Sequence, residues 1–230
     1  MADESSRRFT HWEASHVEVT GALAEHRRLA AAMRVVIERL VLSDAPEAEL
    51  RAAADALERY AERLATHPRR DRMEGFSETA PAGDATAFFD HSPLIGRANP
   101  LAPPIRLEAQ GDRALGTVVF GSAYEGPPGC VHGGFVAAAF DELLGFAQTL
   151  TGSPGMTGTL TIRYRQPTPL HTPLQFEAHV ARIEGRKNFI EGRLHAGERL
   201  CAEADGIFIT IDQARFRKLL ASRVLPPESR

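Results

Sequence analysis

The feature that most constrains the fold is GPPGCVHGGFVAAAFDELLG, residues 126–145, where an apolar run carries one carboxylate, Asp141. Two prolines, a histidine and four glycines lead into this run, and we predict a helix from about residue 132 to 150. Large apolar side chains project away from the Asp141 side, namely Phe135, Val136, Phe140, Leu143 and Phe146. The helix is therefore apolar around most of its circumference, which predicts burial on several sides.

Asp141 shares one face of this helix with mostly small side chains, because each residue advances about 100° around the axis. The members of this face are Gly134, Ala137, Ala138, Asp141, Leu144, Gly145 and Gln148. The small side chains leave room beside the carboxylate for a group that is not protein. An unpaired buried charge costs roughly several kcal/mol, so we interpret Asp141 as part of a site. The alternative is that Asp141 and Glu142 mark the wet edge of an amphipathic helix.

The glycines at the start of the helix suggest an oxyanion site. The first N–H groups of a helix have no internal partner and carry the positive end of its dipole. Gly133 and Gly134 have no side chains, so a polarised oxygen can approach these groups. Gly133 stands eight residues before Asp141, which is about 12 Å along a helix, so the partners of one site would come from two chains. His132 either hydrogen-bonds the ligand or caps the turn.

Residues 20–66 predict a helical hairpin, because they are rich in Ala, Leu, Glu and Arg. In the first helix the apolar residues near helical spacing are Leu23, Ala30, Met33, Ile37 and Leu40. The second helix restarts with Ser43 or Asp44 as N-cap and Pro46 in its first turn, and stops at Pro68. The hairpin could serve oligomer contact, a lid or plain packing. We expect residues 1–80 to be dispensable for the chemistry.

Most of the remaining chain has the sequence pattern of β-strands. IRLEAQGDRALGTVVF predicts two short strands around a Gly-Asp turn before the helix. After the helix, TGTLTIRYRQ, LQFEAHVARI and FIEGRLHAGERLCAEADGIFITI predict four strands, with turns at EGRK and near Gly197. This pattern indicates an α+β class, with an antiparallel sheet and one central helix. We expect a helical extension and linker over 1–85, the main domain over 86–212 and a short helix or tail over 213–230.

Composition excludes several classes of function. The chain has 230 residues, 43% hydrophobic and 25% charged, and a net charge of -3 argues against a nucleic-acid surface. Cys130 and Cys201 match no metal-ligand spacing, and we expect no metal. The first 20 residues hold no apolar signal region, and no stretch reaches the roughly 18 apolar residues of a membrane helix. We therefore expect a cytoplasmic protein without a membrane partner.

Three segments resemble the hotdog-fold acyl-CoA thioesterases, most closely the phenylacetate-pathway (PaaI-like) type and thioesterase superfamily members 4 and 5. They are HGGFVAAAFDELLG, GMTGTLTIRYRQPTPLHTPL and IEGRKNF, and the likeness covers roughly residues 86–212. The resemblance implies a long helix wrapped by a curved antiparallel sheet. It also implies a homodimer or a dimer of dimers, with the active site between subunits and no cofactor.

The resemblance also implies roles for particular residues. Asp141 would act as general base or nucleophile, and the Gly133 N–H would bind the thioester carbonyl oxygen. Thr157, sixteen residues after the acid, would orient the water or the carboxylate from the facing subunit. Another subgroup has an Asn fifteen residues before the acid; here that position is Gly126, so this element is absent.

The strand TGTLTIRYR is compatible with these roles. Alternation places Thr157, Thr159, Thr161, Arg163 and Arg165 on one face and Leu160, Ile162 and Tyr164 on the other. Thr159 replaces Thr157 if the register is shifted, and a solvated face of threonines is the alternative. The candidates for binding the substrate are Gly134, Thr159 and, for coenzyme A phosphates, Arg163, Arg165, Arg186 and Lys187. Charges at turns such as EGRK are also commonly just solvated.

The leading hypothesis is an acyl-CoA thioesterase that uses Asp141, Gly133, His132 and Thr157. One alternative is a hotdog hydratase or dehydratase that pairs His132 with Asp141 to move a proton at the β-carbon. Another is a non-catalytic acyl-CoA-binding module with the helical hairpin as its output element.

Overall fold

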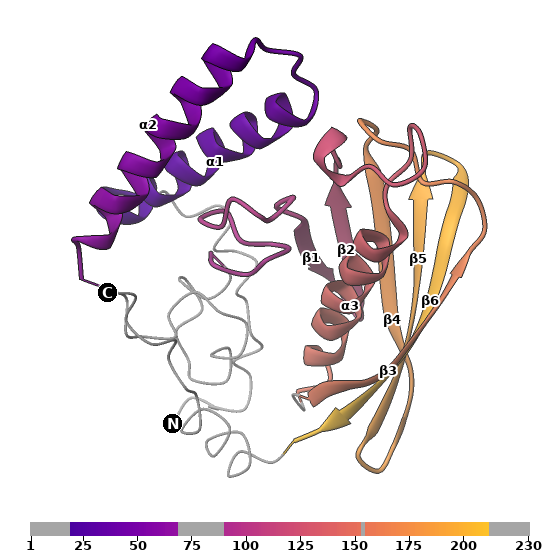
Figure 1. The fold of residues 1–230 in the computed structure, drawn as a ribbon. Helices are drawn as coiled ribbons and strands as arrows, with labels where there is room; N and C mark the ends of the chain where they lie inside the picture. Colours follow the sequence, from indigo (N-terminus) through magenta and orange to yellow (C-terminus); the bar gives the residue numbers. More distant parts are fainter. Residues whose placement is uncertain (1–18, 69–89, 153–154, 212–230) are drawn as a thin grey trace.

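The computed structural model describes residues 19–68, 90–152 and 155–211. These form a six-stranded antiparallel sheet in the order β1-β2-β4-β5-β6-β3, with one long helix, α3, against one face (Figure 1). The α+β class is therefore confirmed. The strands are β1 Arg106–Gln110, β2 Arg113–Val118, β3 Gly155–Tyr164, β4 Leu174–Glu184, β5 Lys187–Ala196 and β6 Arg199–Thr210; the helices are α1 Gly21–Val41, α2 Glu47–Ala65, the 3-10 turn η4 Ser122–Tyr124 and α3 Gly133–Thr149.

Turn chemistry explains three of the strand pairings. The three hairpin turns that the sequence predicts are present, and Gly111, Gly185 and Gly197 occupy them with φ values of 64°, 58° and 59°. Only glycine adopts this left-handed conformation without strain. Each turn joins two strands that are neighbours in the sheet: β1 with β2, β4 with β5, and β5 with β6.

The core lies between α3 and the sheet. Most of the large side chains of α3 that the sequence marks as apolar are buried, and Phe140, Leu143 and Leu144 are fully so, while Phe135 is half-buried. Two strand glycines let the helix lie close: a Cβ at Gly192 would stand 2.8 Å from a Leu144 methyl carbon, and one at Gly206 would stand 2.9 Å from the other. The close approach of α3 to the sheet therefore requires glycine at these positions of β5 and β6.

A β-bulge in β3 corrects the predicted alternation. Thr157 pairs with Phe208, but Thr159 pairs with Ile207, so Gly158 is an extra residue in this strand. The two threonines therefore lie on opposite faces of the sheet, and the expectation that they share one face is wrong. Thr157 faces α3, as do Leu160, Ile162 and Tyr164, whereas Thr159 lies on the outer face. β3 is also an edge strand, with most of its residues exposed.

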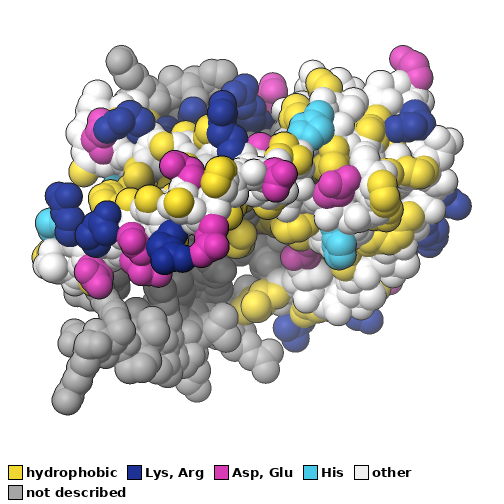
Figure 2. All heavy atoms as spheres, turned by 45° about the horizontal axis from the view of Figure 1, so that its top comes forward, with side chains coloured by type: hydrophobic (Ala, Val, Ile, Leu, Met, Phe, Trp, Pro, Cys, Tyr) yellow, Lys and Arg dark blue, Asp and Glu magenta, His cyan; other side chains and the backbone are white. Residues whose placement is uncertain are grey.

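The helical hairpin is present, but its second helix begins later than predicted. The N-cap of α2 is Pro46, whose carbonyl accepts the N–H groups of Glu49 and Leu50. The predicted N-cap Ser43 instead accepts the Ala45 N–H at 3.1 Å, because its hydroxyl closes the turn between the helices. No residue of α2 is buried, and charged and apolar side chains alternate over the hairpin surface (Figure 2).

An ion pair and hydrogen bonds attach α1 to the rest of the chain. Arg27 forms a two-pronged ion pair with the buried Asp90, with both N–O distances 2.9 Å. Arg34 donates to the carbonyl oxygens of Asn99 at 2.8 Å and Arg97 at 3.2 Å. The boundaries proposed at residues 85 and 212 and the tail over 213–230 lie outside the described residues.

A membrane-spanning helix would need to be both long and strongly apolar, and none of the helices in the described ranges is.

Candidate active site

Asp141 and Thr157 form a hydrogen-bonded pair on α3 and β3. The Thr157 hydroxyl donates to Oδ1 of Asp141 at 2.8 Å. Both side chains belong to the same chain, and the expectation that Thr157 orients the water or the carboxylate from a facing subunit stays a prediction. The pair needs no partner molecule to form.

Asp141 is exposed in the single chain, which corrects its predicted burial. The reason is that the sheet covers only one side of α3. Leu144 and Gln148 turn toward that side and are buried, while Ala137, Ala138 and Gly145 are half-buried. The face of small residues is therefore open, with the carboxylate on it, as a site for a ligand or a second chain requires.

Thr157 is held in place by the start of β3. Buried Gln148 accepts the Gly155 N–H through its Oε1 at 3.1 Å, which ties the first residue of the strand to the last turn of α3. A Cβ at Gly155 would lie 2.6 Å from the Ile209 carbonyl oxygen, so the strand can approach β6 this closely only as glycine. The bulge at Gly158 then turns Thr157 toward the helix.

His132 caps the N-terminus of α3. Its Nδ1 accepts the Gly134 N–H at 3.0 Å, and its carbonyl accepts the Phe135 N–H at 2.9 Å. The capping alternative is therefore the one observed, and a neutral His132 carries its proton on Nε2. The Gly134 N–H is occupied by this contact, whereas the Gly133 N–H finds no acceptor in the described part of the chain. Gly133 is thus the better candidate of the two for an oxyanion donor.

Tyr164 was assigned no role from the sequence, yet it contacts the first residue of α3. Its hydroxyl donates to the Gly133 carbonyl oxygen at 2.8 Å, and a Cβ at Gly133 would lie 3.2 Å from that hydroxyl. Gly126 supports the same turn, because a Cβ there would lie 2.7 Å from the His132 Cα. The space that a side chain at Gly126 would need is therefore taken up by His132.

The four predicted phosphate contacts do not form one cluster. Arg163 pairs with Asp205, and Arg165 binds Glu203 at 2.7 Å on the outer face of the sheet. The hydrogen bond from Arg165 lowers the pKa of Glu203. Arg186 instead donates to the Thr210 carbonyl oxygen at 3.2 Å, next to Lys187 and at the opposite end of β3. Their contact with coenzyme A stays a prediction.

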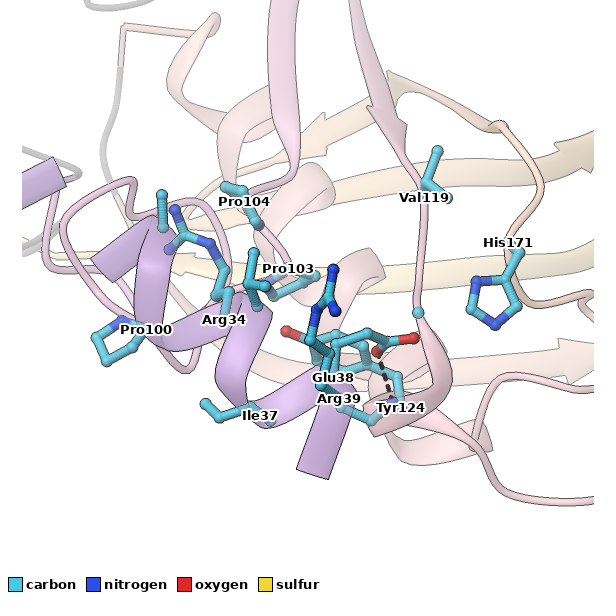
Figure 3. Close-up of a pocket in the computed structure, with 14 residues that line it drawn as sticks. Arg34, Ile37, Glu38, Arg39, Pro100, Pro103, Pro104, Val119, Tyr124 and His171 are labelled. Atoms are coloured by element: carbon cyan, nitrogen blue, oxygen red, sulfur yellow. Dashed lines mark hydrogen bonds between the residues drawn. The ribbon is translucent and has the colours of Figure 1, made fainter. Parts of the chain in front are cut away.

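A groove of about 510 Å³ lies between α1 and the segment that precedes α3 (Figure 3). None of the site residues predicted from the sequence lines it. Its walls include Arg34, Glu38, Tyr124 and His171, with prolines on one side. Burial lowers the pKa of Arg34 and raises that of Tyr124. The sequence analysis did not find this groove, because its walls lie far apart in the chain.

Among the described residues, no cluster of side chains is suited to bind a metal ion. No three His, Cys, Asp or Glu side chains come together there in a way that could hold an ion.

A family model, curated relatives and a solved structure point to one family. The family described as "Thioesterase superfamily" matches residues 128–203. Acyl-coenzyme A thioesterase THEM4 of Xenopus laevis is 37% identical over 93 residues, 40% of this chain and 42% of the relative. Acyl-coenzyme A thioesterase THEM5 of Homo sapiens is 30% identical over 93 residues, 40% of this chain and 38% of the relative. The match thus spans about two fifths of these curated relatives.

One solved structure matches over a much larger share. It is a crystal structure described as a thioesterase superfamily protein, with 32% sequence identity and a TM-score of 0.74. The alignment covers 84% of this chain and 97% of that chain. The likeness therefore extends beyond the sheet and α3.

Proposed function

The chain belongs to the thioesterase superfamily, and on that premise we propose that it is an acyl-CoA thioesterase with Asp141 as the catalytic carboxylate. The resemblance to hotdog-fold thioesterases is confirmed, together with the fold class. The observation that carries the proposal is the Asp141–Thr157 pair, which presents a carboxylate on the open face of α3. The names of the THEM4 and THEM5 relatives support acyl-CoA as the substrate.

The proposed reaction is hydrolysis of the thioester bond by water. The Thr157 hydroxyl donates to Oδ1 of Asp141, which leaves Oδ2 to accept a proton from a water molecule. As this proton is transferred, the water oxygen attacks the carbonyl carbon of the thioester. The negative charge that develops on the carbonyl oxygen is stabilised by the Gly133 N–H. The C–S bond then breaks, and the departing thiolate takes the proton from Asp141, which yields the free acid and CoA.

The geometry favours a site shared between two subunits. Gly133 and Asp141 lie about 12 Å apart along one helix, so one small acyl group cannot contact both within one chain. β3 is an exposed edge strand, and Met156 at its start is 51% exposed. In a two-fold dimer formed along this edge, the two copies of α3 would run antiparallel. The Gly133 end of one helix would then approach the Asp141 region of the other.

We expect the protein to be at least a dimer at micromolar concentration. Sedimentation velocity, combined with an activity assay over the same dilution series, measures this. Turnover should fall as the dimer dissociates, because each site would lose its oxyanion donor. A monomer with full activity would contradict the shared site.

The function is tested by a CoA-release screen over short, medium, long and aromatic acyl-CoAs. Release of CoA that increases with enzyme concentration supports the proposal. Hydration of crotonyl-CoA without CoA release would instead identify a hydratase. Tight binding with negligible turnover would identify an acyl-CoA-binding module.

Thr157→Val is expected to lower kcat by about tenfold, the scale of one hydrogen bond to a charged group. Valine keeps the branched shape but removes the hydroxyl that orients Asp141. Thr157→Ser, which keeps the hydroxyl, is the matched control and should retain most activity. A parental kcat for the valine variant, measured by CoA release at saturating substrate, would remove the Thr157 hydroxyl from the mechanism.

A further inference from the structure

Glu38 of α1 binds the turn that precedes the catalytic helix. Its carboxylate oxygens accept the Ser122 N–H at 2.9 Å and the Ala123 N–H at 3.1 Å. Both donors belong to η4, and Figure 3 shows the side chain reaching from α1 to this turn. Since 84 residues separate Glu38 from Ser122, this contact joins the hairpin to the main domain.

Gly121 makes this contact possible. A Cβ at Gly121 would lie 2.5 Å from Oε2 of Glu38, so any side chain there would displace the carboxylate. Gly121 has a φ of -86°, which every residue can adopt, so the glycine is not needed for its backbone conformation. The close approach of Glu38 is thus the observed constraint at this position.

The same turn continues into the N-terminus of α3. The carbonyl of Tyr124, the last residue of η4, accepts the His132 N–H at 2.9 Å. The Tyr124 ring also packs edge-on against Phe135, with 4.9 Å between the ring centroids. His132 in turn caps the helix and precedes Gly133. A short series of contacts therefore runs from Glu38 through η4 to the oxyanion donor.

The charge on Glu38 suits this arrangement. Burial acts to raise the pKa of its carboxyl, but the N–H groups of Ser122 and Ala123, the Ser122 hydroxyl and nearby His171 outweigh it. The net pKa lies below its ordinary value, so the ionised form is the one that binds the turn. The other anchors of α1, through Arg27 and Arg34, bind the segment from 90 to 99 and not η4.

We infer that Glu38 is a positioning residue, which fixes η4 and thereby the placement of the Gly133 N–H against the thioester carbonyl. This inference rests on the proposed thioesterase function. It assigns the helical hairpin a part in the chemistry, in contrast to the expectation that residues 1–80 are dispensable. The hairpin contributes no reacting atom; it sets where the helix N-terminus lies.

The test compares Glu38→Gln, Gly121→Ala and the double variant with the parent. The glutamine amide has one oxygen that can accept and one NH₂ group that cannot, so it cannot accept both the Ser122 and the Ala123 N–H. Alanine at position 121 displaces the Glu38 carboxylate by its added methyl group. Each single variant should lower kcat by about 3- to 30-fold with KM within about twofold of the parent, because a misplaced donor acts in the transition state. The double variant should be no slower than the worse single one, since both remove the same contact. Glu58→Gln on the exposed α2 is the matched control and should match the parent.

Amide hydrogen exchange supplies a readout that does not depend on turnover. Exchange at Ser122, Ala123 and His132 should be faster in both single variants and unchanged in Glu58→Gln. Parental kcat in Glu38→Gln and Gly121→Ala overturns the inference, as do additive losses in the double variant. If the parent releases no CoA, the proposed function fails, and exchange alone then decides whether Glu38 holds the turn: faster exchange supports this, and unchanged exchange overturns it.

Discussion

Asp141→Asn is expected to lower kcat for CoA release by about 10²–10⁴, the usual contribution of a positioned general base, and by more if the carboxylate is the nucleophile. The amide is nearly isosteric with the carboxylate, and its oxygen can still accept the Thr157 hydroxyl. It cannot take the proton from water. The affinity for acyl-CoA should change little, because the carboxylate acts on the water and not on the CoA moiety.

The measurement is CoA release at saturating substrate, with the melting temperature as the control for folding. Asp141 is exposed, so the melting temperature should stay close to that of the parent. A neighbouring substitution, Glu142→Gln, tests whether the loss of any charge on this part of α3 has the same effect. If Asp141→Asn hydrolyses acyl-CoA at the parental rate, Asp141 is a structural residue and the proposed mechanism is wrong.

Gly133→Pro is expected to lower kcat by about 10²–10³, the cost of removing one oxyanion donor. Proline has no N–H, and the first position of a helix tolerates it well. The Gly133 N–H has no acceptor in the described part of the chain, so its removal breaks no hydrogen bond seen there. His132 before it has φ -59° and ψ 131°, a conformation that a following proline favours.

Gly133→Ala separates the missing donor from added bulk. Alanine keeps the N–H, and its Cβ would lie 3.2 Å from the Tyr164 hydroxyl, so only a small shift of that side chain is required. The alanine variant should therefore be impaired much less than the proline variant in the same assay. Equal losses in the two variants would show that crowding at Tyr164, and not the N–H, limits the reaction.

Much of the fold could be predicted from local patterns. The apolar periodicity of residues 133–149 identifies a buried helix, and the glycines at 111, 185 and 197 identify the hairpin turns. Both signals arise within a few residues of chain, where side-chain spacing and backbone φ decide the conformation. The spacing of the HGG segment and Asp141 likewise indicated the candidate site.

The arrangement of the site was decided by tertiary contacts. The Gly158 bulge placed Thr157 beside Asp141 and turned Thr159 away, and no period-two pattern predicts an extra residue in one strand. The exposure of Asp141 depended on the sheet covering one side of α3 only.

Two further contacts were invisible in the linear sequence, Tyr164 with Gly133 and Glu38 with Ser122. They join residues 31 and 84 positions apart. Residues this distant meet only when the folded chain brings their elements together, so no local spacing could indicate them. The sequence by itself thus determined which residues are proposed to carry the chemistry, and the tertiary structure decided what holds them in place.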